Sequence, residues 1–411
     1  MESTQNNATH PTRDDIDLLD GSFYVDDPHE RYAWMRGNAP VYFDARNGVW
    51  GIASYAALLA MEKDPVTFSN AGGIRPDSGP IPMMIDMDDP EHWKRRKLVN
   101  KGFTPRRVRD SEQKIRDVCD AIIDTVCERG ECDFVTDIAA PLPMILIGDM
   151  LGVEPEDRSD LLQWSDDMVS AQSGNATEEQ WLKAMQAMDG YTEFCTHAVA
   201  QSQARPTDDL MSLLVHAEVD GDRLSPDDVL HESLLILVGG DETTRHVISG
   251  GVEQLLLHPE QRQLLVDDPA KITVAVEEML RWVTPIKNMC RTVTVDTEFM
   301  GQQMTAGQKC MLLFESANRD ETRFDEPFRF DVERRPNEHL AFGFGAHFCL
   351  GQALARLELQ VMFEQLLARL PDLELAADPT TLPRRRANFI SGLESMPVRF
   401  NPTRPLLRSS V

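Results

Sequence analysis

The sequence has no long hydrophobic run and little positive charge. Its longest apolar stretches, near residues 143–147 and 234–238, are far shorter than the roughly 20 apolar residues of a membrane-spanning helix. Residues 1–20 are polar and acidic, without the basic start and apolar run of a signal peptide. Lysine and arginine number 41 against 68 acidic residues, a formal net charge of −27. We therefore expect a cytoplasmic protein with no membrane anchor and no nucleic-acid partner.

Cysteine is sparse, and the chain has no evident linker. The seven cysteines are an odd number scattered over 411 residues, which is not the pattern of a disulfide framework. Cys127 and Cys132 are spaced like a metal-binding pair, but no further ligand lies near them in sequence. Proline, glycine and charge are spread evenly along the chain. We predict a polar tail over residues 1–20 and a single domain over residues 21–411.

One cysteine is distinguished by its surroundings. Cys349 lies in the stretch Phe342-Gly-Phe-Gly-Ala-His-Phe-Cys-Leu-Gly351, directly before a predicted helix over residues 352–370. The positive end of that helix and its free N–H groups favour a thiolate, and the glycines allow a flat, bulky group to approach. A lone thiolate suits an axial position on haem iron better than a zinc or iron–sulfur site. The alternative is a buried structural cysteine in a glycine-rich turn.

A second motif lies inside an unusually long predicted helix. Ser225 as the cap and Pro226 at the first position begin this helix, which we expect to run to Leu257. It contains Gly239-Gly-Asp-Glu-Thr-Thr244, whose two glycines cost about 1 kcal/mol each relative to alanine. The glycines could serve close helix packing, or they could leave room for a ligand beside an acid and an alcohol.

Further charged residues are candidates for binding or for structural pairing. His92 and Arg96 lie on one face of a predicted helix and could hold carboxylates or form a solvated basic face. Glu278 and Arg281 lie at i and i+3 of another helix, a spacing typical of surface pairs. Eight basic residues gather between Lys94 and Arg109, which we call the basic patch. This patch is either a wet surface or a docking site for an acidic electron donor.

Together these motifs resemble the cytochrome P450 family. The Cys349 loop matches the haem-thiolate pattern F-G-x-G-x-H-x-C-x-G, residues 239–243 match the oxygen-binding motif, and Glu278-x-x-Arg281 matches the E-x-x-R motif. The resemblance implies a mainly α, cytochrome P450 fold: a helical prism with small β-sheets and haem b between the long central helix and the helix after the Cys loop. It implies a monooxygenase that activates O₂, because a thiolate ligand favours O–O cleavage.

The same resemblance implies roles for individual residues. Cys349 would be the axial ligand of the haem iron, Glu242 a proton relay, and Thr243 the hydroxyl that holds O₂. Asp241 supplies a second carboxylate, so the choice of Glu242 depends on the register of the motif. The residues expected to contact haem are His92, Arg96, Gly239, Gly240, Arg291, Phe342, Gly343, His347 and Gly351.

The E-x-x-R motif is expected to be structural. In the resembled family this pair is buried and joined by an arginine from the segment before the Cys loop, here Arg334. Buried charges of this kind are tolerable only as a fully hydrogen-bonded network. Loss of Glu278 or Arg281 should therefore cost folding or haem retention.

A closer resemblance is to bacterial cytochrome P450 enzymes that oxidise the side chain of cholesterol and cholest-4-en-3-one. It is carried by Ser69-Asn-Ala-Gly-Gly-Ile-Arg-Pro76, Met83-Met-Ile-Asp-Met-Asp-Asp-Pro90, Leu237-Val-Gly-Gly-Asp-Glu-Thr-Thr-Arg-His246, Asn288-Met-Cys-Arg291 and Ser391-Gly-Leu-Glu-Ser-Met-Pro397. It implies hydroxylation of the terminal side-chain methyl (C26/C27), then oxidation to the aldehyde and acid. The expected apolar wall is Ile74, Met84, Leu235, Val238, Met289 and Phe389.

Alternatives remain open at this level. A macrolide, a fatty acid or another bulky apolar substrate would use the same motifs. A non-catalytic haem sensor or carrier is the alternative outside the enzyme class. The sequence shows no dinucleotide or flavin fingerprint. We therefore expect electrons from NAD(P)H through a separate reductase and a ferredoxin, which could dock on the basic patch.

Overall fold

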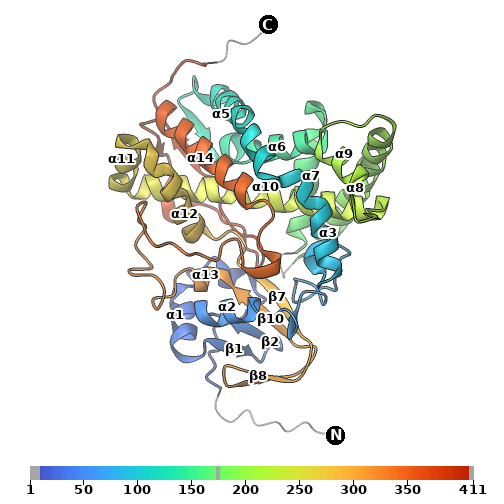
Figure 1. The fold of residues 1–411 in the computed structure, drawn as a ribbon. Helices are drawn as coiled ribbons and strands as arrows, with labels where there is room; N and C mark the ends of the chain where they lie inside the picture. The colour runs from blue at the N-terminus through green and yellow to red at the C-terminus, as the bar shows by residue number, and fades with distance from the viewer. Residues whose placement is uncertain (1–9, 173–175, 407–411) are drawn as a thin grey trace.

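The structure, a computed structural model, describes residues 10–172 and 176–406, which form a mainly helical molecule with small β-sheets (Figure 1). Its α-helices are α1 (His29–Asn38), α2 (Tyr55–Glu62), α3 (Glu91–Val99), α4 (Pro105–Asp110), α5 (Glu112–Val126), α6 (Pro141–Leu151), α7 (Arg158–Ser170), α8 (Glu178–Ala204), α9 (Leu210–His216), α10 (Pro226–Leu257), α11 (Pro259–Asp267), α12 (Ile272–Val283), α13 (Phe314–Ala317) and α14 (Gln352–Arg369). The mainly α fold predicted from the sequence is confirmed.

Helix α10 is the central element of the helical part. The Ser225 side chain accepts a hydrogen bond from the Asp228 N–H, the Asp228 carboxylate accepts one from the Ser225 N–H, and Pro226 occupies the first turn. These caps fix the start where the sequence predicts it. The helix crosses the width of the molecule and packs against α6, α7, α8, α12 and α14 (Figure 1). Most of its second half is therefore buried, charged residues included.

The main sheet lies beside α1 and α2 (Figure 1). Its strand order is β1 (Val41–Asp44), β2 (Val49–Ile52), β10 (Lys309–Leu313), β7 (Asn288–Val293) and β3 (Phe68–Ser69). Strand β10 runs parallel to β2, and the other pairs are antiparallel. The register pairs Arg291 with Cys310, which places Arg291 on an inner strand. The sheet therefore holds this arginine in a fixed position.

Within residues 10–172 and 176–406 there are three smaller sheets. They consist of β11 (Glu374–Leu375), β12 (Pro397–Arg399) and β4 (Glu131–Asp133); of β5 (Glu218–Val219) and β6 (Asp222–Arg223); and of β8 (Thr297–Phe299) and β9 (Gln302–Met304). None of the helices in residues 10–172 and 176–406 is long and apolar enough to cross a membrane.

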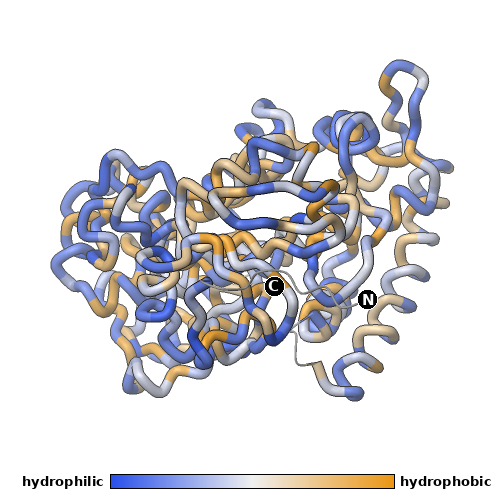
Figure 2. The backbone as a smooth tube through the Cα atoms, turned by 90° about the horizontal axis from the view of Figure 1, so that it is seen from below, coloured by the Kyte–Doolittle hydropathy of each residue, from blue (hydrophilic) through white to orange (hydrophobic). Residues whose placement is uncertain are grey.

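The apolar residues form several clusters, and the outermost loops are mostly hydrophilic (Figure 2). Helix α10 contributes to the two largest, Val247 and Ile248 to one and Leu234 and Leu237 to the other. Residues 1–9 of the predicted tail lie outside the described residues. Its later part, residues 10–20, packs on the main sheet through Leu18, which is buried.

Candidate active site

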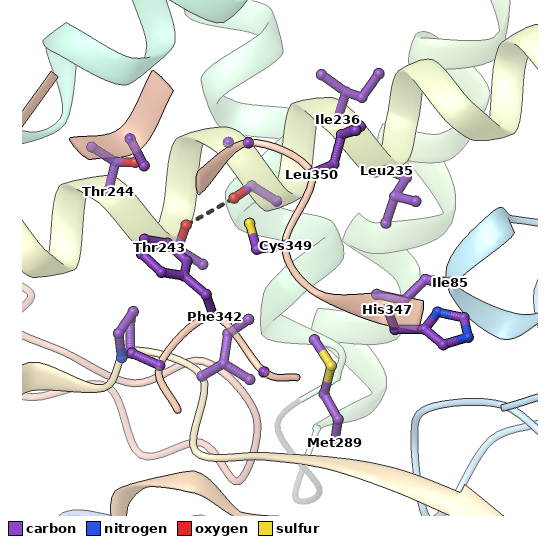
Figure 3. A pocket seen from close by; sticks show the side chains of 18 of the residues that line it. Ile85, Leu235, Ile236, Thr243, Thr244, Met289, Phe342, His347, Cys349 and Leu350 are labelled. Carbon is purple, nitrogen blue, oxygen red and sulfur yellow. Dashed lines mark hydrogen bonds between the residues drawn. The ribbon is translucent and has the colours of Figure 1, made fainter. Parts of the chain in front are cut away.

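An apolar cavity of about 220 Å³ lies between α10, strand β7 and the loop before α14 (Figure 3). Cys349 lines it from the loop, Thr243 from α10 and Met289 from β7. All nine residues predicted to contact haem line the same cavity, although they come from four separate parts of the chain. We call it the Cys349 cavity.

The Cys349 loop needs its glycines for conformation and for space. Gly343 and Gly345 have φ values of +67° and +74°, in the left-handed region that favours glycine. A Cβ at Gly345 would lie 2.9 Å from the main-chain oxygen of Glu62. The Cys349 N–H donates a hydrogen bond of 3.0 Å to the Phe342 carbonyl, which closes the loop. The loop thus presents the sulfur to the cavity at the start of α14.

Opposing effects act on the Cys349 thiol. Burial raises its pKa, and the N–H groups of Gly351 and Gln352 together with the charge of Arg96 oppose this only in part. The sequence argument identified the helix N-terminus correctly but omitted the desolvation of the sulfur, which is the larger effect. A cationic metal bound to the sulfur would favour the thiolate.

Basic side chains gather at one end of the cavity. The rings of His92 and His347 lie with their centroids 4.0 Å apart, and Arg96 and Arg291 line the same region. Burial and neighbouring positive charges lower the pKa of His347 to about 2, and burial lowers the pKa of His92. The His92 Nε2 atom is buried without a hydrogen-bond partner in the described part of the chain. This positive and partly unpartnered region fits the two carboxylates of haem.

Glu62, at the end of α2, is a cavity residue that sequence reasoning missed. Its carboxylate lies 3.3 Å from the Arg291 guanidinium, and its Oε2 atom is buried without a partner among the described residues. Burial raises the pKa of Glu62 to about 7, although Arg291 opposes this. In the sequence, Glu62 is distinguished only as the acidic residue at the end of a short apolar helix. Glu358 on α14 also lines the cavity, and burial raises its pKa to about 8.

The two glycines of the motif at residues 239–244 on α10 have different functions. No atom would lie within 4 Å of a Cβ at Gly239, so this position leaves open space. A Cβ at Gly240 would lie 2.6 Å from the Ile147 side chain, so this position permits close packing against α6. Both interpretations of the sequence therefore apply, to different residues. The Thr243 hydroxyl donates a hydrogen bond of 2.8 Å to the Gly239 carbonyl (Figure 3).

Glu242 is buried, but it is not among the residues that line the Cys349 cavity. It pairs with Arg245, with Arg385 at 2.7 Å and with His246 at 3.5 Å. Burial alone would raise the pKa of Glu242, but the hydrogen bond to His246 and the two arginine charges outweigh burial and hold it well below its usual value. Burial raises the pKa of the neighbouring Asp241 to about 8. To reach Thr243, the Glu242 side chain would have to leave these partners.

Half of the predicted substrate wall lines the cavity. Met84, Leu235 and Met289 do so. The other three, Ile74, Val238 and Phe389, belong to an adjoining apolar cluster that also includes Met289. The sequence did not identify several further apolar lining residues, namely Ile85, Ile147, Ile236, Val247, Ile286 and Leu350.

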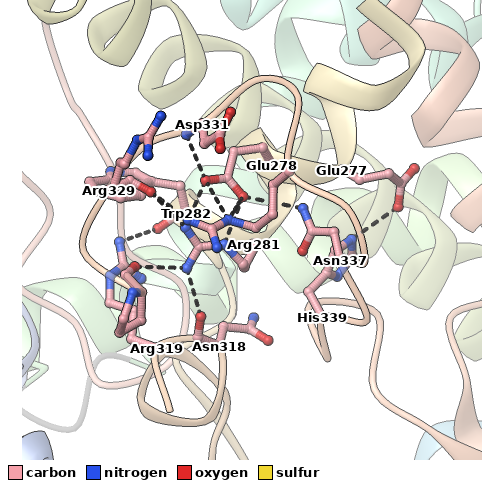
Figure 4. Close-up of polar contacts among 12 residues, drawn as sticks. Glu277, Glu278, Arg281, Trp282, Asn318, Arg319, Arg329, Asp331, Asn337 and His339 are labelled. Carbon is pink, nitrogen blue, oxygen red and sulfur yellow. Dashed lines mark hydrogen bonds and ion pairs between the residues drawn. The ribbon is translucent and has the colours of Figure 1, made fainter. Parts of the chain in front are cut away.

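A buried charge network is centred on Glu278 and Arg281 of α12 (Figure 4). Arg281 donates two hydrogen bonds of 2.7 Å to the Glu278 carboxylate, and the Arg334 Nε atom lies 3.1 Å from the same carboxylate. Glu278 also accepts from the Asp331 N–H at 3.0 Å and from Asn337 at 3.2 Å. The structure thus brings the three residues of the predicted network together with a full set of hydrogen bonds.

The chain is similar in sequence and in fold to known proteins. A family model described as cytochrome P450 matches residues 272–385. A steroid C26-monooxygenase of Mycobacterium tuberculosis is 58% identical over 393 residues, covering 95% of this chain and 98% of that protein. A steroid C26-monooxygenase of Mycolicibacterium smegmatis is 56% identical over 397 residues, covering 96% and 98%. The solved structure of a Mycobacterium marinum cytochrome P450 in complex with pseudoionone superimposes with a TM-score of 0.86 at 33% identity, covering 96% of this chain and 100% of that one.

Proposed function

The chain belongs to the cytochrome P450 family, and we propose that it is a haem-thiolate monooxygenase that hydroxylates the terminal side-chain methyl of a steroid such as cholesterol or cholest-4-en-3-one. Further oxidation of the alcohol would give the aldehyde and the acid. The observation that carries the substrate proposal is the 58% identity to a steroid C26-monooxygenase over 95% of the chain. A single domain over residues 21–411 and a cytoplasmic location stay predictions.

Bound haem would supply the iron centre at which O₂ is activated. Cys349 would hold the iron from the loop before α14. Arg96 and Arg291, with His92 and His347, would hold the haem carboxylates, because charge-assisted hydrogen bonds to carboxylates are among the strongest in proteins.

Other residues of the cavity would orient the substrate and supply protons. Met84, Leu235 and Met289 present an apolar wall that excludes water and suits a hydrocarbon side chain. Thr243 presents its hydroxyl to the cavity from α10. Glu242 would move protons toward that hydroxyl, a function worth roughly 10²–10⁴ in rate when the proton donor is positioned.

We propose that a ferredoxin, reduced from NAD(P)H through its reductase, docks on the basic patch. Support comes from the position of Arg96, which lies on α3 and donates to the Phe348 carbonyl beside Cys349. Part of the positive charge of the basic patch is already balanced within the protein, since Lys97 pairs with Asp220 at 2.8 Å. Reversal of charge at Lys97 and Arg107 should weaken ferredoxin binding and flatten its salt dependence, whereas reversal at the exposed and distant Arg399 should not. If charge reversal at Arg399 weakened ferredoxin binding as much as charge reversal at Lys97 and Arg107, the proposed docking site would be wrong.

The substrate proposal is tested with the haem-bound protein and a working redox chain. Cholest-4-en-3-one should shift the haem absorption spectrum and yield an O₂-dependent product that mass spectrometry finds one oxygen heavier. A macrolide or fatty acid that binds and reacts while the steroid does neither would overturn the substrate. Binding without any O₂-dependent product from any of these compounds would favour the sensor or carrier.

A further inference from the structure

A second cavity, of about 290 Å³, borders α10 further toward its C-terminal end, where His246, Gly250, Glu253 and Gln254 line it. It is lined by residues from the start of α1, the end of α12, α13 and the segment 384–393. Its wall is polar, and the residues that matter here are His246, Glu253, Lys287, Glu315, Arg319 and Arg384. We call it the polar cavity.

Several buried polar atoms of this wall have no hydrogen-bond partner within residues 10–172 and 176–406. They are Nδ1 of His246, Oε2 of Glu315, Nε and Nη1 of Arg319, and Nδ1 of His29. A buried polar atom left without a hydrogen-bond partner is destabilising, so a cavity lined by five of them must supply partners.

Water is the occupant that fits. The described lining contains three acidic side chains (Asp27, Glu253 and Glu315) and three cationic ones (Lys287, Arg319 and Arg384). Burial lowers the pKa of both His29 and His246 to about 4, so neither adds charge at neutral pH. A lining without net charge favours neither an anion nor a cation, and the volume accommodates a cluster of waters. Asp27 and Arg384, both exposed, form the rim toward solvent.

His246 joins this cavity to Glu242. Its ring is buried, and its Nε2 atom lies 3.5 Å from the Glu242 carboxylate. A Cβ at Gly392 would lie 2.2 Å from Nδ1, so only glycine lets the C-terminal segment pass this close to the ring. The other two partners of Glu242 are Arg245 and Arg385, and a guanidinium does not release its proton near neutral pH. Among these three partners, the imidazole alone can pass a proton.

We propose that the polar cavity holds a water cluster that delivers protons from solvent to Glu242 through His246. When one ring nitrogen of His246 takes up a proton from the water cluster, the other ring nitrogen releases a proton to the Glu242 carboxylate. The charge of the ring is therefore unchanged after each transfer. The proposal rests on the proposed function, because it assumes that Glu242 relays protons to the Cys349 cavity. His246 is a positioning and relay residue that does not touch the substrate.

A competing path exists on the other side of Glu242. Asp166 on α7 pairs with Arg245 at 2.8 Å and with Arg385 at 3.0 Å, and its side chain is 34% exposed. Its carboxylate could collect protons directly from solvent. The experiment must therefore compare the two sides.

The test uses the haem-bound protein with its redox chain and the variants His246→Phe, His246→Asn and Asp166→Asn. The control is His231→Phe, the same change on α10 at a residue that lines neither cavity. Product formed per electron consumed should fall about tenfold in both His246 variants and stay unchanged in His231→Phe. This tenfold fall is smaller than the roughly 10²–10⁴-fold loss of rate expected when all positioned proton transfer is removed. The reason is that Glu242 and Thr243 are still present in the His246 variants.

The solvent deuterium isotope effect on product formation should also rise in the His246 variants, which a merely structural role would not cause. Haem content and the substrate-induced spectral shift serve as checks that the fold is intact. A loss confined to Asp166→Asn, or no change at His246, would overturn the proposal.

A readout independent of turnover is diffraction from the wild-type protein. Ordered waters should lie within hydrogen-bond distance of Nδ1 of His246, Oε2 of Glu315 and Nε of Arg319. A dry polar cavity would overturn the proposal even if the His246 variants did not fold. Absence of any O₂-dependent product from the wild type would instead defeat the proposed function and leave the water cluster to be judged by diffraction.

Discussion

Glu278→Ala probes the buried charge network centred on Glu278 and Arg281. The change removes both 2.7 Å hydrogen bonds from Arg281 and the 3.1 Å contact with Arg334, and leaves the Arg281 charge fully buried. Loss of one partner of a buried ion pair costs about 3–5 kcal/mol. Folded proteins have only about 5–15 kcal/mol of total stability, so this change should remove a large part of it. We therefore expect little folded, haem-containing protein.

The measurement is the free energy of unfolding from denaturant titration of whatever folded protein is obtained, together with haem content per chain. The matched control is Glu374→Ala, which breaks an exposed pair with Arg399 of 3.0 Å and should cost at most about 1 kcal/mol. A loss of less than about 1 kcal/mol in Glu278→Ala, or one equal to the control, would refute a structural role for the network.

Two further changes test individual contacts. Gly239→Ala should stabilise α10 by about 1 kcal/mol, the usual difference in helix propensity between glycine and alanine. Gly240→Ala should lose that gain because its Cβ would clash with Ile147. Thermal unfolding measures both variants, and equal unfolding midpoints would contradict the assigned packing. Glu62 has a folded-state pKa of about 7, above its ordinary 4.5, so its contribution to stability is present below pH 4.5 and is lost as pH rises to 7. Glu62→Gln should flatten the stability profile over this pH range, and an unchanged profile would mean that Arg291 already keeps Glu62 ionised.

The sequence predicts what depends on local chemistry. The capping residues Ser225 and Pro226 set the start of α10, and the helix ends before His258 and Pro259, as expected. The residues predicted to contact haem belong to motifs with fixed spacing, and all of them line the Cys349 cavity. These features need no knowledge of distant contacts.

What the sequence did not predict arises from contacts between distant segments. Glu242 is held away from the Cys349 cavity by Arg385, which lies 143 residues further along the chain. Glu62 enters the cavity because the Cys349 loop packs on the end of α2, and nothing in either segment predicts that contact. The polar cavity likewise depends on how α1, α12 and the C-terminal segment enclose His246. The register of a motif predicts where a residue lies along a helix, but it does not predict which other side chains that residue contacts.

The central claim is that the Cys349 sulfur binds the haem iron as an anion. The most direct measurement is the absorption spectrum of the ferrous carbonyl complex, recorded for the wild type and for Cys349→Ala after incubation with hemin. The wild type should show the red-shifted Soret band of a thiolate-ligated haem, and Cys349→Ala should lose it. A wild type that takes up no haem, or a Cys349→Ala protein whose carbonyl spectrum is unchanged, would contradict the account.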